Sequence, residues 1–505
     1  MDRKAGIFFS ALIVAIGGII YEIIIATTAS YLIGNGVLHF SLSTGIFLAG
    51  MGIGSFLSPY ISKNPEQNFV IIELLLGLFG GFSVSFLFAA FAFTELFYLV
   101  FVLLTCGIGI LIGTEIPLFL AILDDRSGKK MRELTARILS VDYLGSLIAS
   151  IIFPLILLPQ LGLLRTSFLV GLTNLLVGVL ILFSFSEITK KYKLALLLFF
   201  SAVLLVVGLS QHTKLTTFFN KGLYQDEVIF NKQSEYQTIV VTKFREDLRL
   251  YLDGNIQFSS IDEYRYHEAL VHIPIAHCVI TPKKVLILGG GDGLALREIL
   301  KYEHIQAVVL VDLDKEVTNL ASNFKPIVEL NERSMYSHKL EIINQDAFNY
   351  LLENADLFDL IIIDLPDPNN EALAKLYSIE FYSLVRRHLS HSGIMVTQAT
   401  SPYYTNATFW SIDASLKEVF DYTYAYRIQI PSFGEWGFVM AAGEELALDK
   451  SFQFPKSNKI IIDTNQIPHY FHFDSDMDRP EKLKISSLFN PQISLLYDEE
   501  IRKWQ

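Results

Sequence analysis

Long apolar segments in the first 210 residues constrain this chain more than any other feature. A helix that crosses a membrane needs about 20 mostly apolar residues. The sequence offers such segments at roughly 5–33, 40–61, 69–92, 95–122, 138–158, 163–186 and 193–210. A soluble helical bundle would need a polar face on each helix, which these segments lack. Residues 1–210 are therefore predicted to form a multi-spanning α-helical membrane domain of about seven spans.

Four acidic residues interrupt these apolar segments: Glu22, Glu73, Glu115 and Asp142. A carboxylate inside a membrane is costly and is a candidate for function. One interpretation is that each is protonated or bonded to polar side chains of a packed bundle. The other is that together they line a cavity for a cationic molecule, and the sequence leaves both open.

The second part of the chain is acidic. Residues 1–210 contain 12 Lys and Arg and 11 Asp and Glu, whereas residues 211–505 contain 28 and 41. This balance argues against nucleic acid as a partner and favours small cationic ligands. Stretches such as YQTIVVTKF and LRLYLDGNIQF alternate as hairpins do, so residues 215–277 are predicted to form a small β-strand domain.

Strand-like runs alternate with helical patterns from residue 281 onward. The strands are expected at 285–288, 307–311, 340–343, 359–363 and 394–397. Such alternation is typical of right-handed βαβ units in a doubly wound sheet. Residues 281–450 are therefore predicted to form a Rossmann-like α/β domain, and residues 451–505 a C-terminal tail or helix.

A glycine-rich turn, LGGGDGLALRE, follows the first of these strands. Gly289, Gly290, Gly291 and Gly293 let the backbone pass close to a ligand, as in NAD, FAD and S-adenosylmethionine sites. Asp292 inside the turn would repel a pyrophosphate, which makes dinucleotides less expected. The alternative is an ordinary Asp-Gly turn.

Acidic residues also end the next three strands, where ligands of such sheets bind. Asp312 lies about 20 residues beyond the glycines, as expected for a residue that binds ribose hydroxyls. Asp346 is suited to an adenine amino group, and Asp314 to a helix cap. Asp364 and Asp367, in IIIDLPDPNN, are held by prolines with no basic residue beside them in the sequence. Such a site favours a cation.

Together these motifs resemble the spermidine synthase family of polyamine aminopropyltransferases, in its bacterial membrane-anchored branch. The resemblance covers about 224–440 and rests on YQ (236–237), LDGNIQ (252–257), DEYRYHEALVH (262–272), GGGDG (289–293), VDLD (311–314), DA (346–347), DLPDP (364–368) and Gln398. It implies transfer of the aminopropyl group of decarboxylated S-adenosylmethionine to a diamine, above all putrescine, giving spermidine and methylthioadenosine. The resemblance also implies that the Rossmann-like domain is of the S-adenosylmethionine methyltransferase-like type. Decarboxylated S-adenosylmethionine is then a co-substrate, and no cofactor or metal is expected. The only cysteines, Cys106 and Cys278, cannot form a cysteine metal cluster.

The resemblance also implies the roles of individual residues. The donor is held by Gln237, Asp292, Asp312 and Asp346, with Asp292 on its free amine. The acceptor amine is handled by Tyr266, Asp364 and Asp367, with Gln398 in the same pocket. Asp364 would take up the proton of the attacking amine while Tyr266 orients its lone pair. His267 is expected at the acceptor side or in helix packing, rather than on a metal.

The acceptor end departs from the family pattern. DPNN replaces the usual DPxGP, and Phe433 stands near the place where soluble relatives carry an amine-binding tyrosine. Glu435 and Trp436 offer a carboxylate and an aromatic face to a cation instead. A packed hairpin turn is the alternative for this pair, and the identity of the acceptor stays open.

Two other functions are compatible with these patterns. One is a methyltransferase that uses S-adenosylmethionine, which Asp292 disfavours because it would face the substrate's own carboxylate. The other is a polyamine transporter or sensor whose synthase-like domain only binds. Tyr266, Asp364 and Gln237 together favour catalysis, because a binder has no need to deprotonate an amine.

The expected location is the cell, or inner, membrane, with the lipid bilayer as a partner. Lys and Arg gather in the loops on the side of the N-terminus, and the opposite loops contain only Arg165. The N-terminus is therefore predicted to be cytoplasmic. Seven spans would then place the catalytic domain outside, although its substrate is made in the cytosol, so the two expectations conflict. A homodimer is left open.

Overall fold

The computed structural model describes residues 3–34, 36–123, 128–185, 188–224, 226–448, 454 and 460–504. The chain divides into two compact units, Met1–Val228 and Ile229–Gln505. The first unit extends beyond the predicted boundary at residue 210 because the short helix α9 (His212–Leu223) belongs to it.

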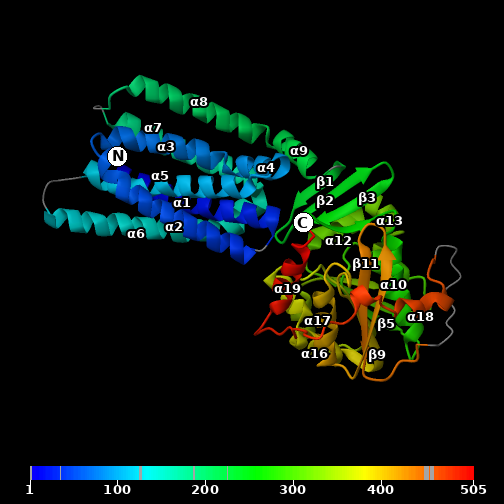
Figure 1. Cartoon of the computed structure of the whole chain (residues 1–505). Coiled ribbons are helices and arrows are strands. Elements are labelled where there is room, and N and C mark those ends of the chain that lie inside the picture. The colour runs from blue at the N-terminus through cyan, green and yellow to red at the C-terminus, as the bar shows by residue number, and fades with distance from the viewer. Residues whose placement is uncertain are drawn as a thin grey trace. The chain divides into compact units, whose positions relative to one another are not determined.

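The first unit consists of helices, most of which run side by side (Figure 1). They are α1 (Arg3–Ile33), α2 (Gly36–Ile61), α3 (Pro65–Gly81), α4 (Ser83–Phe93), α5 (Phe97–Leu123), α6 (Gly128–Ile152), α7 (Leu158–Ser184), α8 (Lys191–Ser210) and α9. A π-helical segment, Phe153–Leu157, joins α6 to α7. Apolar side chains of α1, α3, α5 and α7 form its core.

Several of these helices are long and apolar enough to cross a membrane. Among the described residues there are five by length and composition, or up to six if the bent pair α3 and α4 counts as one span. The sequence predicted about seven. The difference lies in Arg132–Ser184, which counts as one run of 53 residues but was divided into 138–158 and 163–186 from the sequence. Gly162 lies between those two segments with a non-helical backbone, at φ 71° and ψ 179°.

Glycines allow α2 and α5 to approach closely. A Cβ atom on Gly54 would lie 2.0 Å from the carbonyl oxygen of Ile110, and one on Gly113 would lie 2.1 Å from that of Met51. Neither position has room for a side chain. Small residues at such crossings are typical of helix packing in lipid.

Two of the four acidic residues in the apolar segments, Glu22 and Glu73, accept hydrogen bonds from polar side chains. Asn174 donates a hydrogen bond of 2.9 Å to Glu73 and accepts one of 3.0 Å from Tyr21. Thr44 donates to Glu22 at 2.6 Å. For Glu22 and Glu73 the structure thus agrees with the interpretation that they are bonded within a packed bundle.

The second unit contains two sheets. The smaller has the order β1-β2-β3-β4, with β1 (Glu227–Gln233), β2 (Thr238–Phe244), β3 (Asp247–Leu252) and β4 (Asn255–Ser259). Helix α10 (Glu263–His277) follows it. The range 215–277, expected as a small β domain, contains this sheet and α10; it also includes part of α9, which belongs to the first unit.

The larger sheet has the order β10-β11-β9-β8-β5-β6-β7. Its strands are β5 (Lys284–Gly289), β6 (Ala307–Asp312), β7 (Leu340–Asn344), β8 (Phe358–Asp364), β9 (Leu389–Gln398), β10 (Tyr422–Ile430) and β11 (Gly434–Ala442). Strands β5 to β9 pair in parallel, and β10 and β11 form an antiparallel hairpin at one edge. The five strands expected from the sequence and the Rossmann-like fold are thus confirmed.

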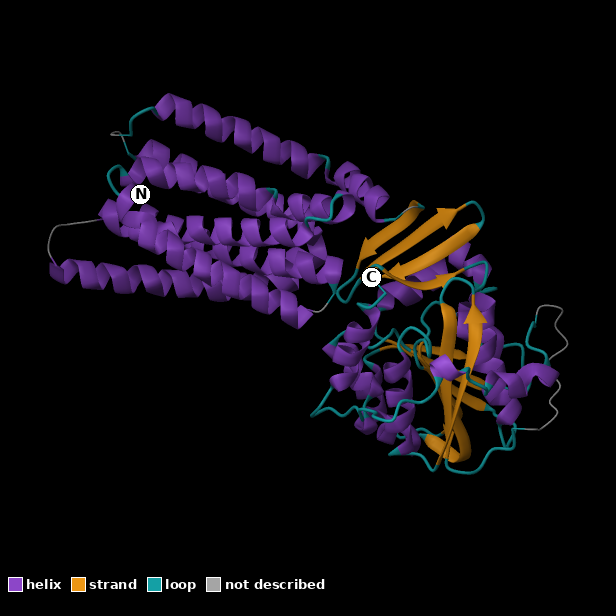
Figure 2. Ribbon diagram, in the orientation of Figure 1, coloured by secondary structure: helices purple, strands orange, loops and turns teal. Residues whose placement is uncertain are grey.

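Helices cover both faces of the larger sheet (Figure 2). Besides α10, the helices of this unit are α11 (Leu294–Ile299), α12 (Lys315–Asn323), α13 (Lys325–Leu330), α14 (Ala347–Glu353), α15 (Glu371–Ala374), α16 (Ile379–Arg387), α17 (Asn406–Lys417), α18 (Ile467–Tyr470) and α19 (Gln492–Ile501). Alternate strand residues enter different cores: Ile287 packs with α10 to α12 and the small sheet, and Leu288 with α14, α16 and α17. Both are fully buried, which explains why these strands read as continuous apolar runs.

Candidate active site

The candidate site lies at the carboxyl edge of the larger sheet. Because β5, β6, β8 and β9 are parallel, their last residues, Gly289, Asp312, Asp364 and Gln398, lie at the same edge. Gly289 is paired directly with Asp364 in the sheet. The expected gathering of acidic residues at this edge is therefore present, and it follows from the parallel topology.

The glycine turn brings backbone and carboxylates together. Gly289 has φ 85°, and a Cβ atom there would lie 2.0 Å from the carbonyl oxygen of Asp364. A Cβ atom on Gly291 would lie 2.4 Å from Oδ2 of Asp312. Both positions exclude a side chain, so this turn is more closely packed than an ordinary Asp-Gly turn requires.

Asp292 and Asp312 lie on the donor side predicted from the sequence. Asp312 accepts hydrogen bonds from the backbone N–H of Gly291 at 3.0 Å and of Asp314 at 2.9 Å. Asp292 accepts one from Leu294 N at 2.8 Å. Burial raises the pKa of Asp312 to about 7 and that of Asp292 to about 6. Each repels nearby acids, so this side of the site favours a positive charge.

Asp364 and Asp367 form the predicted acceptor side. The hydroxyl of Tyr266, on α10, donates to Oδ1 of Asp364 at 2.6 Å. Burial raises the pKa of Asp364, and that of Asp367 to about 6. Asp364 and Asp292 interact electrostatically. The two predicted sides thus belong to one cluster of carboxylates.

His267 supplies a positive charge beside this cluster. Its Nδ1 lies 2.8 Å from a carboxylate oxygen of Glu263, which in turn binds Arg297 at 2.8 Å and 3.0 Å. Burial alone would lower the pKa of His267, but the hydrogen bond to Glu263 raises it to about 9. His267 is therefore protonated at neutral pH, and its charge lowers the pKa of Asp292 and Asp364. The Glu263–Arg297 pair was not foreseen from the sequence.

Gln237 and Asp346, which were predicted to hold the donor, are bonded to protein partners. Gln237 donates to Asp314 at 3.0 Å, and Asp314 caps α12 by accepting from Glu316 N at 2.9 Å, as the sequence predicted for it. Asp346 binds Lys375 at 2.7 Å and also accepts a bond from a backbone N–H of α14 at 3.1 Å. Each carboxylate oxygen keeps a second lone pair for a ligand. The donor roles of Gln237 and Asp346 stay predictions.

Gln398, predicted to line the acceptor pocket, is fixed beside Asp367 by several hydrogen bonds. Its Nε2 donates to Leu365 O at 2.7 Å and to the hydroxyl of Tyr377 at 2.6 Å, and lies 3.3 Å from Oδ1 of Asp367. Its Oε1 accepts from Thr400 N at 2.9 Å. Thr400 is buried at φ 67°, an unusual backbone for a threonine. No sequence pattern pointed to Tyr377 or Thr400.

A residue far along the chain also reaches this side. Tyr497, on α19, donates from its hydroxyl to Oδ2 of Asp367 at 2.8 Å. The sequence predicts only a C-terminal tail or helix for residues 451–505, and nothing in their pattern indicates this contact. Asp367 is thus bonded at both of its carboxylate oxygens.

Glu435 and Trp436, in the hairpin of β10 and β11, both contact other protein side chains. Glu435 forms an ion pair of 2.9 Å with Arg427 on the neighbouring strand. The ring of Trp436 packs against Phe433 at 5.2 Å and Tyr266 at 6.4 Å between centroids. The structure therefore favours the packed hairpin that the sequence left as the alternative for Glu435 and Trp436.

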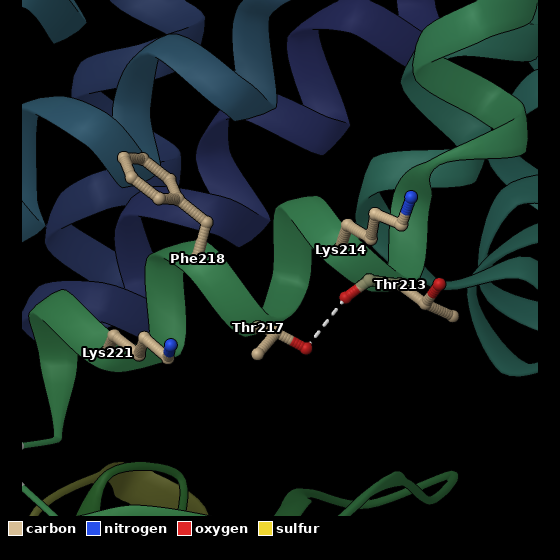
Figure 3. A pocket seen from close by; sticks show the side chains of 5 residues that line it. All are labelled: Thr213, Lys214, Thr217, Phe218 and Lys221. Atoms are coloured by element: carbon tan, nitrogen blue, oxygen red, sulfur yellow. Dashed lines mark hydrogen bonds between the residues drawn. The ribbon is translucent and has the colours of Figure 1, made fainter.

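A surface depression with a cavity volume of about 290 Å³ lies along α9 (Figure 3). It is lined by Thr213, Lys214, Thr217, Phe218 and Lys221. Thr217 donates to the backbone carbonyl of Thr213 at 2.9 Å. Its two lysines disfavour a cationic ligand, and it contains none of the acidic residues described above.

Comparisons with known proteins identify the family. Residues 263–451 match the model of the spermine/spermidine synthase domain. The chain is 41% identical over 500 residues to a polyamine aminopropyltransferase of Leptospira interrogans, covering 98% of this chain and 99% of the relative. It is 42% identical over 511 residues to polyamine aminopropyltransferase 2 of Ralstonia nicotianae, covering 99% of each.

A solved structure of spermidine synthase from Thermotoga maritima is 25% identical, with a TM-score of 0.41, and covers 55% of this chain and 88% of that one. The matches to the Leptospira and Ralstonia relatives extend over both units of the chain, including the helical one. The resemblance inferred from short motifs is thereby confirmed, and this chain belongs to the spermidine synthase family of polyamine aminopropyltransferases.

Proposed function

We propose that this protein is a membrane-anchored aminopropyltransferase that makes spermidine from putrescine and decarboxylated S-adenosylmethionine. The family relationship gives the aminopropyl transfer and the co-substrate. The matching relatives favour neither a methyltransferase nor a transporter that only binds. The acceptor, the membrane anchor and the roles of individual residues are the new elements of the proposal.

One observation carries the assignment of the site. Four partly buried carboxylates, Asp292, Asp312, Asp364 and Asp367, gather at one sheet edge, and burial raises the pKa of each. His267 offsets only part of this negative charge. Decarboxylated S-adenosylmethionine carries a sulfonium and an ammonium, and a diamine is also cationic at neutral pH. Such cationic ligands relieve the repulsion among these carboxylates.

The donor end is assigned by chemistry. Asp292 has one oxygen bonded to Leu294 N, and the other is available to the ammonium of the donor. Asp312 holds the glycine turn through Gly291 N and presents its remaining lone pairs to the ribose hydroxyls. S-adenosylmethionine has a carboxylate where the decarboxylated donor has only hydrogen, and Asp292 would repel it.

The transfer step needs a neutral amine. An alkylamine has a pKa near 10, so only about one molecule in a thousand is neutral at pH 7. Asp364 accepts the proton as the amine nitrogen attacks the carbon next to sulfur. The carbon–sulfur bond breaks with its electron pair on sulfur, which leaves neutral methylthioadenosine. The raised pKa of Asp364 makes it a stronger base than an exposed aspartate, and Tyr266 fixes its orientation through Oδ1.

Purified protein supplied with decarboxylated S-adenosylmethionine is expected to release methylthioadenosine when putrescine is added. Putrescine, cadaverine, 1,3-diaminopropane and spermidine are to be compared by kcat/KM, with products identified by mass spectrometry. The highest kcat/KM is expected for putrescine. A preference for another amine would overturn the putrescine assignment, and no release with any amine would overturn the enzymatic one.

The membrane anchor is supported by the first unit. Its helices expose large apolar side chains, including Phe56 at 75%, Leu155 at 70% and Phe183 at 66%. Such surfaces are unfavourable in water and suit contact with lipid. Five helices of this unit, or six with the bent pair, are long and apolar enough to cross a bilayer.

The protein in isolated membranes is expected to resist extraction by alkaline carbonate and to dissolve in detergent. Release by carbonate alone would contradict the anchor. We place the catalytic unit on the cytoplasmic side, where the substrates are made. A fluorescent reporter fused after residue 505 should therefore be active, and an alkaline phosphatase reporter at the same position inactive. The opposite pattern would place the unit outside.

A further inference from the structure

We infer that Tyr497 on α19 completes the acceptor end of the site, where it orients Asp367 and receives a terminal primary ammonium of the diamine. The inference deepens the proposed function and rests on it. Tyr497 lies outside residues 263–451, which the family model matches. It therefore adds a positioning residue that neither the motifs nor the family domain provides.

Asp367 is held at both of its carboxylate oxygens. Its Oδ2 accepts the hydroxyl proton of Tyr497 at 2.8 Å, and its Oδ1 lies 3.3 Å from Nε2 of Gln398. Gln398 has stronger partners in Leu365 and Tyr377. The shorter bond from Tyr497 is thus the main restraint on the orientation of this carboxylate.

Helix α19 is held firmly against α17. Glu500 lies three residues after Tyr497, so both side chains lie on one face of the helix. The buried carboxylate of Glu500 accepts from Ala407 N at 2.9 Å, from Thr408 N at 2.9 Å and from the Thr408 hydroxyl at 2.7 Å. These groups form the first turn of α17, where a negative charge is also favoured by the helix dipole.

A further bond fixes the residues that follow α19. Trp504 donates from Nε1 to the carbonyl oxygen of Tyr404 at 3.0 Å, and the two rings lie 5.1 Å apart between centroids. Tyr497 is thus presented by an anchored helix rather than by a loose terminus. A phenol held in this way loses little entropy when it binds a ligand.

The phenol oxygen of Tyr497 can still accept a hydrogen bond. Its single proton is donated to Asp367, which leaves its lone pairs as acceptors. Among residues 226–448 and 460–504, no hydrogen bond is directed to this oxygen. An ammonium group has three N–H donors and no acceptor. It can therefore bind Asp367 and the Tyr497 oxygen together, which a neutral hydroxyl or an anion in its place cannot do as well.

Replacing Tyr497 by phenylalanine tests this role in the 505-residue protein. With saturating donor, kcat/KM for putrescine is expected to fall roughly tenfold or more, since a hydrogen bond to a charged group is lost. The Kd of decarboxylated S-adenosylmethionine should stay within about twofold of the parent value. Tyr382→Phe is the matched control, because Tyr382 is fully buried and its hydroxyl has no hydrogen-bond partner among the described residues.

The pH profile separates positioning from a merely structural role. The bond from Tyr497 lowers the pKa of Asp367, so its loss should move the acid limb of kcat/KM for putrescine to higher pH. Tyr382→Phe should leave this limb unchanged. An unchanged kcat/KM in Tyr497→Phe, or an equal loss of donor affinity, would overturn the inference. If the parent protein transfers no aminopropyl group to any amine, the proposed function fails instead.

Discussion

Replacing Asp364 by asparagine is expected to lower kcat about 10³-fold while the Kd of decarboxylated S-adenosylmethionine stays unchanged. Asparagine can still accept the hydroxyl proton of Tyr266, so the geometry at Oδ1 is retained. It cannot take up the proton of the amine, and almost all of the amine is protonated at neutral pH. Single-turnover release of methylthioadenosine measures the chemical step, and calorimetry measures donor binding.

Asp356, near the opposite end of β8 from Asp364, serves as a control for this substitution. Asp356 precedes β8, has a side chain that is 57% exposed, and pairs with Lys284 at 3.1 Å. Asp356→Asn removes the same charge from the chain without entering the site, and it should leave kcat within about twofold of the parent. A kcat for Asp364→Asn within tenfold of the parent would show that another group receives the proton.

Replacing Asp292 by asparagine has the second largest expected effect. The variant should bind decarboxylated S-adenosylmethionine roughly 10- to 100-fold more weakly, because a charge-assisted hydrogen bond to the ammonium is lost. S-adenosylmethionine should be affected much less, because its carboxylate gains from removal of the negative charge. Binding of both ligands by calorimetry checks the difference, and equal weakening would exclude the proposed contact with the amine.

The same substitution should stabilise the empty protein in a pH-dependent way. Burial raises the pKa of Asp292 from 3.8 to about 6, so ionisation of this group opposes folding above that pH. As the pH falls through about 6 toward 4, the parent takes up the proton and this penalty disappears. Asp292→Asn should therefore melt at a higher temperature than the parent at pH 8 and at a similar one at pH 4. A lower melting temperature at pH 8 would contradict this account.

The larger sheet and its acidic edge could be predicted from the sequence because both depend on local patterns. Fully buried parallel strands give continuous apolar runs, and the residue that ends each run lies at the ligand-binding edge. Asp312 and Asp364 were assigned in this way. Gly289 and Gly291 were recognised from the glycine-rich turn that follows the first strand. A side chain on Gly289 would meet the backbone of Asp364, and one on Gly291 would meet the side chain of Asp312.

Other parts of the site depend on contacts that no local pattern reveals. Tyr497 and Asp367 are 130 positions apart in the sequence, and Glu263 and Arg297 meet only because α10 packs on α11. The number of spans also depends on features that hydropathy does not reveal. Hydropathy finds apolar segments, but it does not show that Arg132–Ser184 forms one continuous stretch or that α3 and α4 are bent against each other.

The anchoring of α19 also bears on the order of events during synthesis. The ribosome makes residues 492–501 after every other residue described in the site. Until they emerge, Asp367 lacks the bond from Tyr497, and the first turn of α17 lacks the carboxylate of Glu500. The surroundings of Asp367 are thus completed late in synthesis, when the apolar helices of the first unit have long left the exit tunnel.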